Sequence, residues 1–252
     1  MAQGFGTESL EPLIGKVLQI YKGGPESRKG KVVGVGDDYL LIDTEGEGLI
    51  YYNTDHIKSV VEDLNATNSY PNKPEDYYTR YLEVETLNDL LGELRYEILR
   101  VDRGGPESRV GRLLAVGDDY FVMHTKEDGL LYYQTHHVKS ISVEANKNNY
   151  QLNEYPEHYE GGTLDEVFQN LQNYWIKINR GGPESVEGVL TGILDDYVML
   201  IRNKEIYRIS AFHIRNFSYR DPNTVSEGEE SEDNNQQAQQ QANDQKKKGN
   251  RK

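Results

Sequence analysis

The chain has 252 residues, no cysteine and a formal net charge of −14. This charge argues against a general nucleic-acid binder, which needs a basic surface, and against binding to anionic membranes. Without cysteine there is no disulfide framework and no thiolate metal site. The N-terminal residues lack the basic and apolar regions of a secretory signal, and no apolar run approaches the roughly 20 residues that cross a bilayer, so we expect neither a signal peptide nor a membrane span.

A five-residue box, Gly-Gly-Pro-Glu-Ser, occurs three times, beginning at Gly23, Gly104 and Gly181. The intervals, 81 and 77 residues, are too long for a solenoid repeat and suit a small module with its own core. We predict modules at 5–62, 85–143 and 162–219, linkers at 63–84 and 144–161, and a tail at 220–252. Modules of this size are marginal alone, so packing between modules or between chains is expected.

Each module is predicted to open with a short helix, because apolar residues lie three positions apart at matching distances before the box. In the second and third copies a threonine stands three residues before an acid, which is the spacing of a capped helix start. The apolar pairs are Leu10 with Leu13, Leu91 with Leu94 and Phe168 with Leu171, and the capping pairs are Thr86 with Asp89 and Thr163 with Glu166.

An apolar stretch then predicts a strand that enters the box. The box itself is predicted to be a structural turn, because paired glycines accept positive φ and proline fixes φ near −65°. A later glycine in each copy (Gly30, Gly111 and Gly188) indicates a β-bulge or tight bend. The turn residues are Gly23, Gly24, Pro25 and Glu26; Gly104, Gly105, Pro106 and Glu107; and Gly181, Gly182, Pro183 and Glu184.

Four further strands are predicted in each module, and an Asp-Asp-Tyr turn separates the second strand from the third. The last strand is expected to begin at His56, His137 and His213. A short helix followed by five strands, with glycine at the bend, favours a mainly β fold of three tandem small bent barrels of the Sm-like or SH3-like kind. The linkers contain several tyrosines and are expected to lie against the modules, whereas the acidic, Gln-rich tail with its basic end is expected to be disordered.

The three boxes are accompanied in the first two copies by Gly-Asp-Asp-Tyr and by Tyr-Tyr-x-x-x-His-(Ile/Val)-Lys-Ser. This combination resembles the spore coat protein B family of endospore-forming bacilli over residues 8–218. The third copy is looser, with Leu194 before its Asp pair and no Tyr-Tyr. The resemblance implies a structural protein of the outer spore coat, made in the mother cell, with other coat proteins as partners and self-association as an option. It implies no enzymatic reaction and nominates no catalytic, cofactor or metal residue.

Two interpretations of the repeated polar residues remain open. Glu26, Glu107 and Glu184, with the Asp pairs and the three histidines above, could form carboxylate–histidine metal sites. Alternatively, each residue fixes a turn or a strand end by hydrogen bonds, and we favour this interpretation because no short-spaced ligand motif is present. The box also lacks the Gly-x-x-x-x-Gly-Lys-Ser/Thr pattern of a phosphate-binding loop.

The tyrosines of the Tyr-Tyr pairs are expected to be core residues, and exposed tyrosines are candidates for oxidative cross-linking. Tail glutamines and lysines are candidates for isopeptide cross-links. We expect a structural coat component acting through protein–protein assembly, with an Sm-like RNA-binding protein as the alternative. The box carries an acid where an RNA binder would need a base. A hydrolase would need a nucleophile constellation, and the sequence contains none that we recognise.

Overall fold

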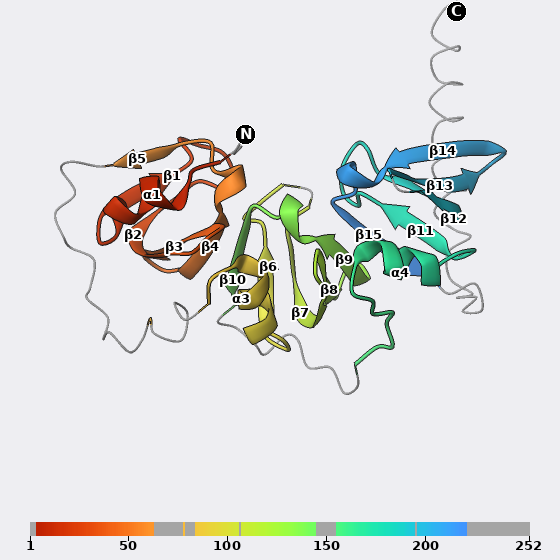
Figure 1. The fold of residues 1–252 in the computed structure, drawn as a ribbon, viewed down its shortest axis with the longest axis horizontal. Helices are drawn as coiled ribbons and strands as arrows, with labels where there is room; N and C mark the ends of the chain where they lie inside the picture. Colours follow the sequence, from red (N-terminus) through yellow and green to blue (C-terminus); the bar gives the residue numbers. More distant parts are fainter. Residues whose placement is uncertain are drawn as a thin grey trace, which may run out of the picture. The chain divides into compact units, whose positions relative to one another are not determined.

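The structure, a computed structural model, describes residues 4–62, 78, 84–105, 107–144, 155–194 and 196–220. The fold is mainly β, and its strands belong to one large antiparallel sheet that is not closed. The strands follow one another in three groups of five, which we call the first, second and third strand sets (Figure 1). Within the described residues, no helix is both long and apolar enough to span a membrane.

The helices and strands have the following bounds. The first set contains α1 (Thr7–Leu10), η1 (Glu11–Leu13), β1 (Val17–Ile20), β2 (Arg28–Val35), β3 (Tyr39–Thr44), β4 (Gly48–Asn53), η2 (Thr54–His56) and β5 (Val60–Glu62). The second contains α3 (Leu87–Glu93), β6 (Ile98–Val101), β7 (Arg109–Val116), β8 (Tyr120–Thr125), β9 (Gly129–Gln134), η3 (Thr135–His137) and β10 (Ser140–Val143). The third contains α4 (Leu164–Asn170), β11 (Trp175–Ile178), β12 (Val186–Leu194), β13 (Tyr197–Arg202), β14 (Glu205–Ser210), η5 (Ala211–His213) and β15 (Asn216–Arg220).

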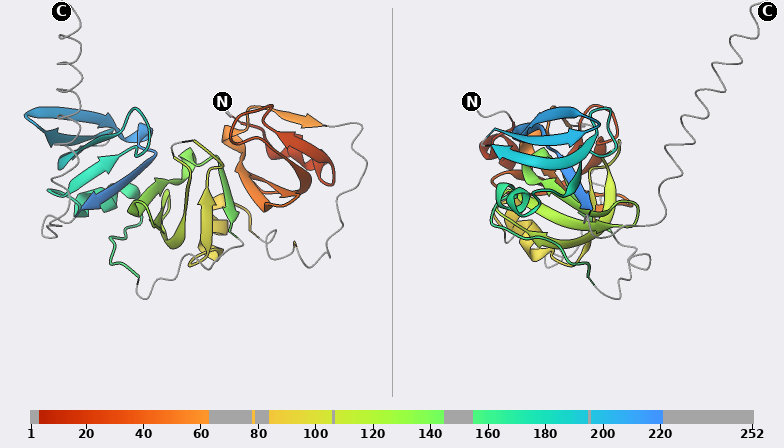
Figure 2. Two further views of the ribbon diagram at one scale, coloured as in Figure 1. Left: turned by 180° about the vertical axis from the view of Figure 1, so that it is seen from behind. Right: turned by 90° about the vertical axis from the view of Figure 1, so that its right-hand side faces the viewer.

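The helix starts follow the predicted capping chemistry. The side chain of Thr86 accepts a hydrogen bond from the amide of Asp89, and that of Thr163 accepts one from the amide of Glu166. Each threonine therefore satisfies an amide that the first helical turn leaves free. The buried residues of α3 and α4 lie on one side of each helix, as the apolar spacing predicted, and Figure 2 shows both helices from two further directions.

The strand pairing does not confirm the three tandem barrels that the sequence favoured, because no described strand set closes on itself. Within each set the order is fourth, third, second, first and fifth strand, so the first strand pairs with both the second and the fifth. The fifth strand of a set does not complete a ring with its own fourth strand. Instead β10 pairs with β4, and β15 pairs with β9. The sheet therefore passes from one set to the next and remains open.

The predicted bulge glycines also behave differently. Gly30, Gly111 and Gly188 pair in regular register, whereas the irregularity lies a few residues later, for example between Val32 and Gly34. A Cβ on Gly30 would lie 2.7 Å from the carbonyl oxygen of Asp43. These glycines are thus needed for close approach of the neighbouring strand rather than for a bulge.

The apolar core follows the same connections as the sheet. One buried cluster lies within the first set and includes Leu18, Ile42 and Tyr52. A second cluster joins residues of the first set, such as Tyr39 and Tyr51, to the helix and strands of the second set. A third joins the second set to the third in the same manner. Burial of apolar side chains therefore stabilises the two junctions between the sets as well as each set.

Candidate functional site at the junctions between strand sets

The Gly-Gly-Pro-Glu-Ser boxes form turns between the first and second strands of each set. One glycine in each box has positive φ: Gly24 at 91°, Gly105 at 90° and Gly181 at 87°. A non-glycine residue with positive φ comes shortly before, namely Tyr21, Asp102 or Asn179. The paired glycines therefore supply the backbone freedom expected of them. Pro106 lies outside the described residues, and the purely structural role of the whole motif stays a prediction.

Glu26, in the first box, is directed into the junction with the second set. Its residue is 7% exposed, and its carboxylate accepts hydrogen bonds from the amide of Arg103 at 2.7 Å and from Ser140 Oγ at 2.7 Å. The backbone carbonyl of Glu26 accepts a third bond, from the hydroxyl of Tyr52 at 2.7 Å. These donors satisfy the hydrogen-bonding needs of the buried carboxylate, so Glu26 joins the first set to residues of the second set that are distant from it in the sequence.

The equivalent glutamates of the other boxes have other environments. The side chain of Glu107 is 12% exposed and pairs with Arg215 of the third set, Oε1 to Nη1, at 2.6 Å. The side chain of Glu184 is 77% exposed and reaches Arg215 only at 4.0 Å. Nothing in the sequence of the boxes distinguishes the three glutamates. Glu184 is exposed because no described strand follows the third set.

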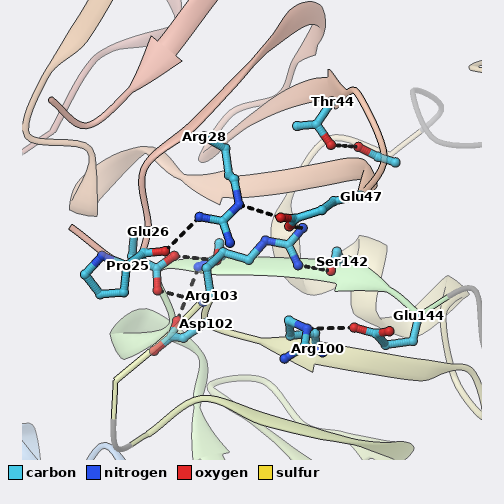
Figure 3. A network of polar contacts seen from close by, with 12 residues as sticks. Pro25, Glu26, Arg28, Thr44, Glu47, Arg100, Asp102, Arg103, Ser142 and Glu144 are labelled. Carbon is cyan, nitrogen blue, oxygen red and sulfur yellow. Dashed lines mark hydrogen bonds and ion pairs between the residues drawn. The ribbon is translucent and has the colours of Figure 1, made fainter. Parts of the chain in front are cut away.

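A cluster of charged residues lies beside Glu26 at the first junction (Figure 3). Glu47 accepts from Arg28 Nε of its own set at 2.8 Å and pairs with Arg103 Nη2 of the second set at 2.9 Å. Arg103 Nη1 also donates to Ser142 Oγ at 2.9 Å. Burial lowers the pKa of Arg103, and Glu47 opposes this shift. We call the Arg–acid–Arg–Ser arrangement the junction clasp.

The second junction contains the same clasp with an aspartate as its acid. Asp128 accepts from Arg109 Nε at 2.5 Å and from Arg180 Nε at 3.0 Å, and Arg180 Nη1 donates to Ser218 Oγ at 2.8 Å. Burial tends to raise the pKa of Asp128, but its hydrogen bonds to the two guanidinium groups outweigh burial and hold the pKa below its ordinary value. The ionised carboxylate is therefore the form that this junction stabilises.

A second acid, Asp102, is buried beside the first clasp. Its Oδ1 accepts from the amide of Lys139 at 2.9 Å, and its Oδ2 lies 3.6 Å from Lys139 Nζ. Burial raises the pKa of Asp102, although the ammonium group of Lys139 opposes the shift. At the second junction Asn179 takes this place and accepts from the amide of Arg215 at 2.8 Å. An uncharged amide thus meets the same hydrogen-bonding need without the cost of a buried charge.

The Asp-Asp-Tyr turns contribute to the junctions through their second aspartate. Asp38 Oδ1 accepts from the amide of Leu87 at 2.7 Å, and Asp119 Oδ1 accepts from the amide of Leu164 at 2.8 Å. Leu87 and Leu164 begin the helices of the following set, so each aspartate occupies a free amide of a helix that belongs to its neighbour. Burial raises the pKa of Asp38, and its hydrogen bond from Leu87 opposes the shift.

The three histidines were expected to begin the last strand and instead end short 3₁₀ turns, η2, η3 and η5. His56 Nε2 donates to the carbonyl oxygen of His136 at 2.6 Å, and His137 Nε2 donates to that of Phe212 at 2.5 Å. Burial lowers the pKa of His137 to about 4, with the neighbouring His136 and His56 adding to the effect. His137 therefore acts as a neutral donor across the second junction.

The carboxylate–histidine metal hypothesis gains no support from these positions, because glutamate, aspartate and histidine of one set bind different groups of the next set. In the part of the chain that the structure describes, no group of three or more His, Cys, Asp or Glu residues is placed to hold a metal ion. Asp195 lies outside that part.

The paired tyrosines are core residues, as predicted. Tyr51, Tyr52, Tyr132 and Tyr133 are at most 3% exposed. Of the linker tyrosines, Tyr78 donates to Asp43, the carbonyl of Tyr159 accepts from Tyr132, and Tyr155 stacks on Tyr96. Tyr70, Tyr77, Tyr81 and Tyr150 lie outside the described residues, as does the tail from 221 onward with its glutamines and lysines. Cross-linking through any of these groups stays a prediction.

The clasp was not predicted, although the sequence contains a signal for it. Arg28 and Arg109 stand immediately after their boxes, and Arg103 and Arg180 stand immediately before theirs. The matching positions in the remaining copies hold Val186 and Lys22. An arginine after the box in the first two copies, and before it in the last two, is the pattern expected for contacts between consecutive sets.

Comparison with known proteins identifies the family to which the chain belongs. No family model matches the chain. Spore coat protein B of Bacillus subtilis (strain 168) is 37% identical over 209 residues, which are 83% of this chain and 53% of that protein. The chain is a relative of spore coat protein B. It spans about half the length of that curated relative. Nothing in the comparison or in the described residues supports the Sm-like RNA-binding alternative.

Proposed function

We propose that the chain is a structural component of the spore coat that acts through protein–protein assembly and not through catalysis. The observation that carries this proposal is its 37% identity to spore coat protein B of Bacillus subtilis. We propose synthesis in the mother cell, deposition on the developing spore, and other coat proteins as partners, because a coat component must meet its neighbours there.

The polar residues of the junctions fit this role. Buried carboxylates such as Glu26 and Asp128 have hydrogen-bond donors and cations as partners, and these partners position one strand set on the next. Groups that are fully paired in this manner contribute to a defined geometry and leave no free nucleophile or base. The described polar clusters are therefore better suited to holding a scaffold together than to chemistry on a substrate.

We further propose that each strand set is a module of the small bent-barrel kind, Sm-like or SH3-like. Each module stays open, and in the second and third sets the fifth strand pairs with the preceding set. The order of helix and strands, and the pairing of the first strand with both the second and the fifth, support this description. The proposed boundaries are 5–62, 85–143 and 162–219. Three small modules in series offer a coat many surfaces for contact at little cost in sequence length.

A fluorescent fusion to the full chain, observed during sporulation, tests the proposed function. We expect fluorescence to collect around the developing spore and to remain on the released spore, whereas the free fluorescent protein expressed from the same promoter stays in the mother cell. Fluorescence that remained diffuse in the mother cell, with the fusion shown to be intact, would contradict a coat role.

A further inference from the structure

We propose that copies of this chain associate head to tail, with the free edge of β5 of one copy pairing with the free edge of β14 of the next. Among the described strands, β5 and β14 are the two ends of the sheet. Every other fourth strand is paired with the fifth strand of the set that follows. Within the described residues no set follows the third and none precedes the first, so the two free edges are complementary halves of one recurring junction.

The recurring junction is defined by contacts that both examples share. The amide of the residue that ends the fourth strand donates to the carbonyl oxygen of the residue before the fifth strand of the next set. These bonds run from Asn53 to Lys139 at 3.1 Å and from Gln134 to Arg215 at 3.1 Å. A histidine three residues later donates across the junction, and an aspartate before the third strand holds the first helical amide of the next set. The contacts that join the first set to the second are thus the same as those that join the second set to the third.

The third set presents the groups that would receive a following set. Ser210 pairs with Tyr197 as Asn53 pairs with Tyr39, so its amide is the equivalent outward donor. His213 and Asp196 are exposed, whereas their counterparts His56, His137, Asp38 and Asp119 are partly buried. Within the described residues, neither His213 nor Asp196 has a side-chain bond of the kind that these counterparts make.

Apolar exposure on the third set points to the same face. Ile206, on β14, is 55% exposed. Its counterparts by register, Leu49 and Leu130, are partly buried because they pack against the core of the following set. Ile201, which pairs with Ile206, is 41% exposed. Exposed apolar side chains on an unpaired edge strand favour pairing with another strand.

The first set retains the residue types that, in the second set, contact the preceding set. Lys58, Ser59 and Val60 stand where Lys139, Ser140 and Ile141 stand in the second set. Val61 on the free edge of β5 is 43% exposed. A second copy would therefore bring Lys22 and Lys58 toward the exposed carboxylate of Glu184. At the first junction the equivalent residues lie beside Glu26, where the amide of Arg103 donates to Glu26 and the ammonium group of Lys139 pairs with Asp102.

Two differences make this junction weaker than those within the chain. In place of Leu87 and Leu90, whose side chains join the shared core, the first helix has Gly6 and Ser9. The clasp is also missing, because Lys204 lies in the hairpin that holds Glu47 or Asp128 in the other sets, and Val186 follows the third box. We therefore expect association that depends on protein concentration rather than an obligate dimer.

Substitutions at the two edges test the proposal by sedimentation and light scattering of the full chain. Ser210→Pro removes the outward amide, and the backbone accepts proline because φ at Ser210 is already −57°. Val61 stands where Ser142 stands in the second set, beside Arg103 and Glu47 of the first clasp. Val61→Lys therefore places a cation where the proposed contact would already bring Lys22 and Lys204 together. Ser210→Ala keeps the amide and is the matched control. Circular dichroism and the melting temperature establish that each variant is folded.

We expect the wild type and Ser210→Ala to associate as concentration rises, and each edge variant to associate at least about tenfold more weakly. An equal mixture of the two edge variants should form a single 1:1 complex, because each supplies the edge that the other lacks. A wild type that stays monomeric overturns the proposal. Association that Ser210→Pro abolishes and Val61→Lys leaves intact also overturns it, since β14 would then pair with itself. Association unaffected by either substitution does the same.

The inference deepens the proposed coat role and rests on it for its biological setting, but the two tests are separable. A chain that reaches the spore surface and stays monomeric in solution contradicts the head-to-tail contact alone. A chain that associates as described but remains diffuse in the mother cell contradicts the coat role alone.

Discussion

Replacing Glu26 by alanine should destabilise the protein far more than the same change at Glu184, although both residues occupy the same position of an identical box. Glu26→Ala leaves two buried donors, the amide of Arg103 and the hydroxyl of Ser140, without an acceptor. An unsatisfied buried donor costs about 1–3 kcal/mol, so the expected loss is about 2–6 kcal/mol. Glu184 is 77% exposed, and its single ion pair spans 4.0 Å, so its removal should cost at most about 1 kcal/mol.

Urea unfolding followed by two probes measures this difference. Far-ultraviolet circular dichroism reports all three sets, whereas the fluorescence of the single tryptophan, Trp175 on β11, reports the third set. In Glu26→Ala the dichroism should change at lower urea than the tryptophan signal, because the weakened junction joins the first two sets. For a unit of about 200 residues, a loss of about 4 kcal/mol lowers the melting temperature by about 10 °C.

Glu107→Ala serves as an intermediate case, because its carboxylate has one close partner, Arg215, at 2.6 Å. The expected order of destabilisation is Glu26 first, Glu107 second and Glu184 last. Equal losses at the three positions would refute the reasoning, since they would show that the box acts within each turn and that the neighbouring set is irrelevant. Gln at position 26 should recover part of the loss, because its amide oxygen can still accept one bond.

Further predictions concern other residues of the sheet and the junctions. Gly111→Ala should lower the free energy of unfolding by about 1–3 kcal/mol, because the new Cβ would lie 2.6 Å from the carbonyl oxygen of His124. Gly92→Ala, in open space on α3, should instead raise it by about 0.5–1 kcal/mol in the same melting assay. Acidification should weaken the fold between about pH 6.5 and pH 4. In this range the unfolded chain protonates His137, whereas burial keeps the pKa of His137 in the folded protein at about 4. Allowing for the partial exposure of His137, the free energy of unfolding should fall by about 1–2 kcal/mol, as measured from the urea midpoint, and the loss should be smaller in His137→Gln. Arg180→Lys should cost about 1–2 kcal/mol in urea unfolding, because one ammonium group cannot contact both Asp128 and Ser218 as the guanidinium does, and an unchanged midpoint would contradict the clasp.

Local features of the fold could be predicted because their causes are local. The threonine caps of α3 and α4, the strands on either side of each box and the positive φ at Gly24 and Gly105 depend on residues within a few positions of one another. Burial of Tyr51 and Tyr132 was also predictable, since aromatic residues in apolar strands favour the core.

The partner of each fifth strand could not be predicted, because a hydrogen-bonding edge carries almost no sequence signal. The side chains of β10 would be buried whether its free edge paired with β9 of its own set or with β4 of the preceding set. The choice is made by long-range contacts, such as that of Glu26 with Ser140, whose residues are 114 positions apart. The open sheet was not predicted for this reason, and the clasp was missed because its members belong to different copies.

Glu26, Glu107 and Glu184 occupy the same position of the box in different environments, and the differences indicate what limits the length of the sheet. Glu26 is covered by the second set and Glu107 by the third, whereas Glu184 awaits a cover that the described chain does not supply. A head-to-tail junction built from the same contacts each time can in principle be repeated more than twice. The places where it weakens are Gly6 and Ser9 on the receiving helix and Lys204 beside β14. If copies associate as proposed, a lower affinity and not a missing surface limits the continuation of the sheet beyond three sets, and a crowded coat that raises the local concentration of the chain would favour this continuation.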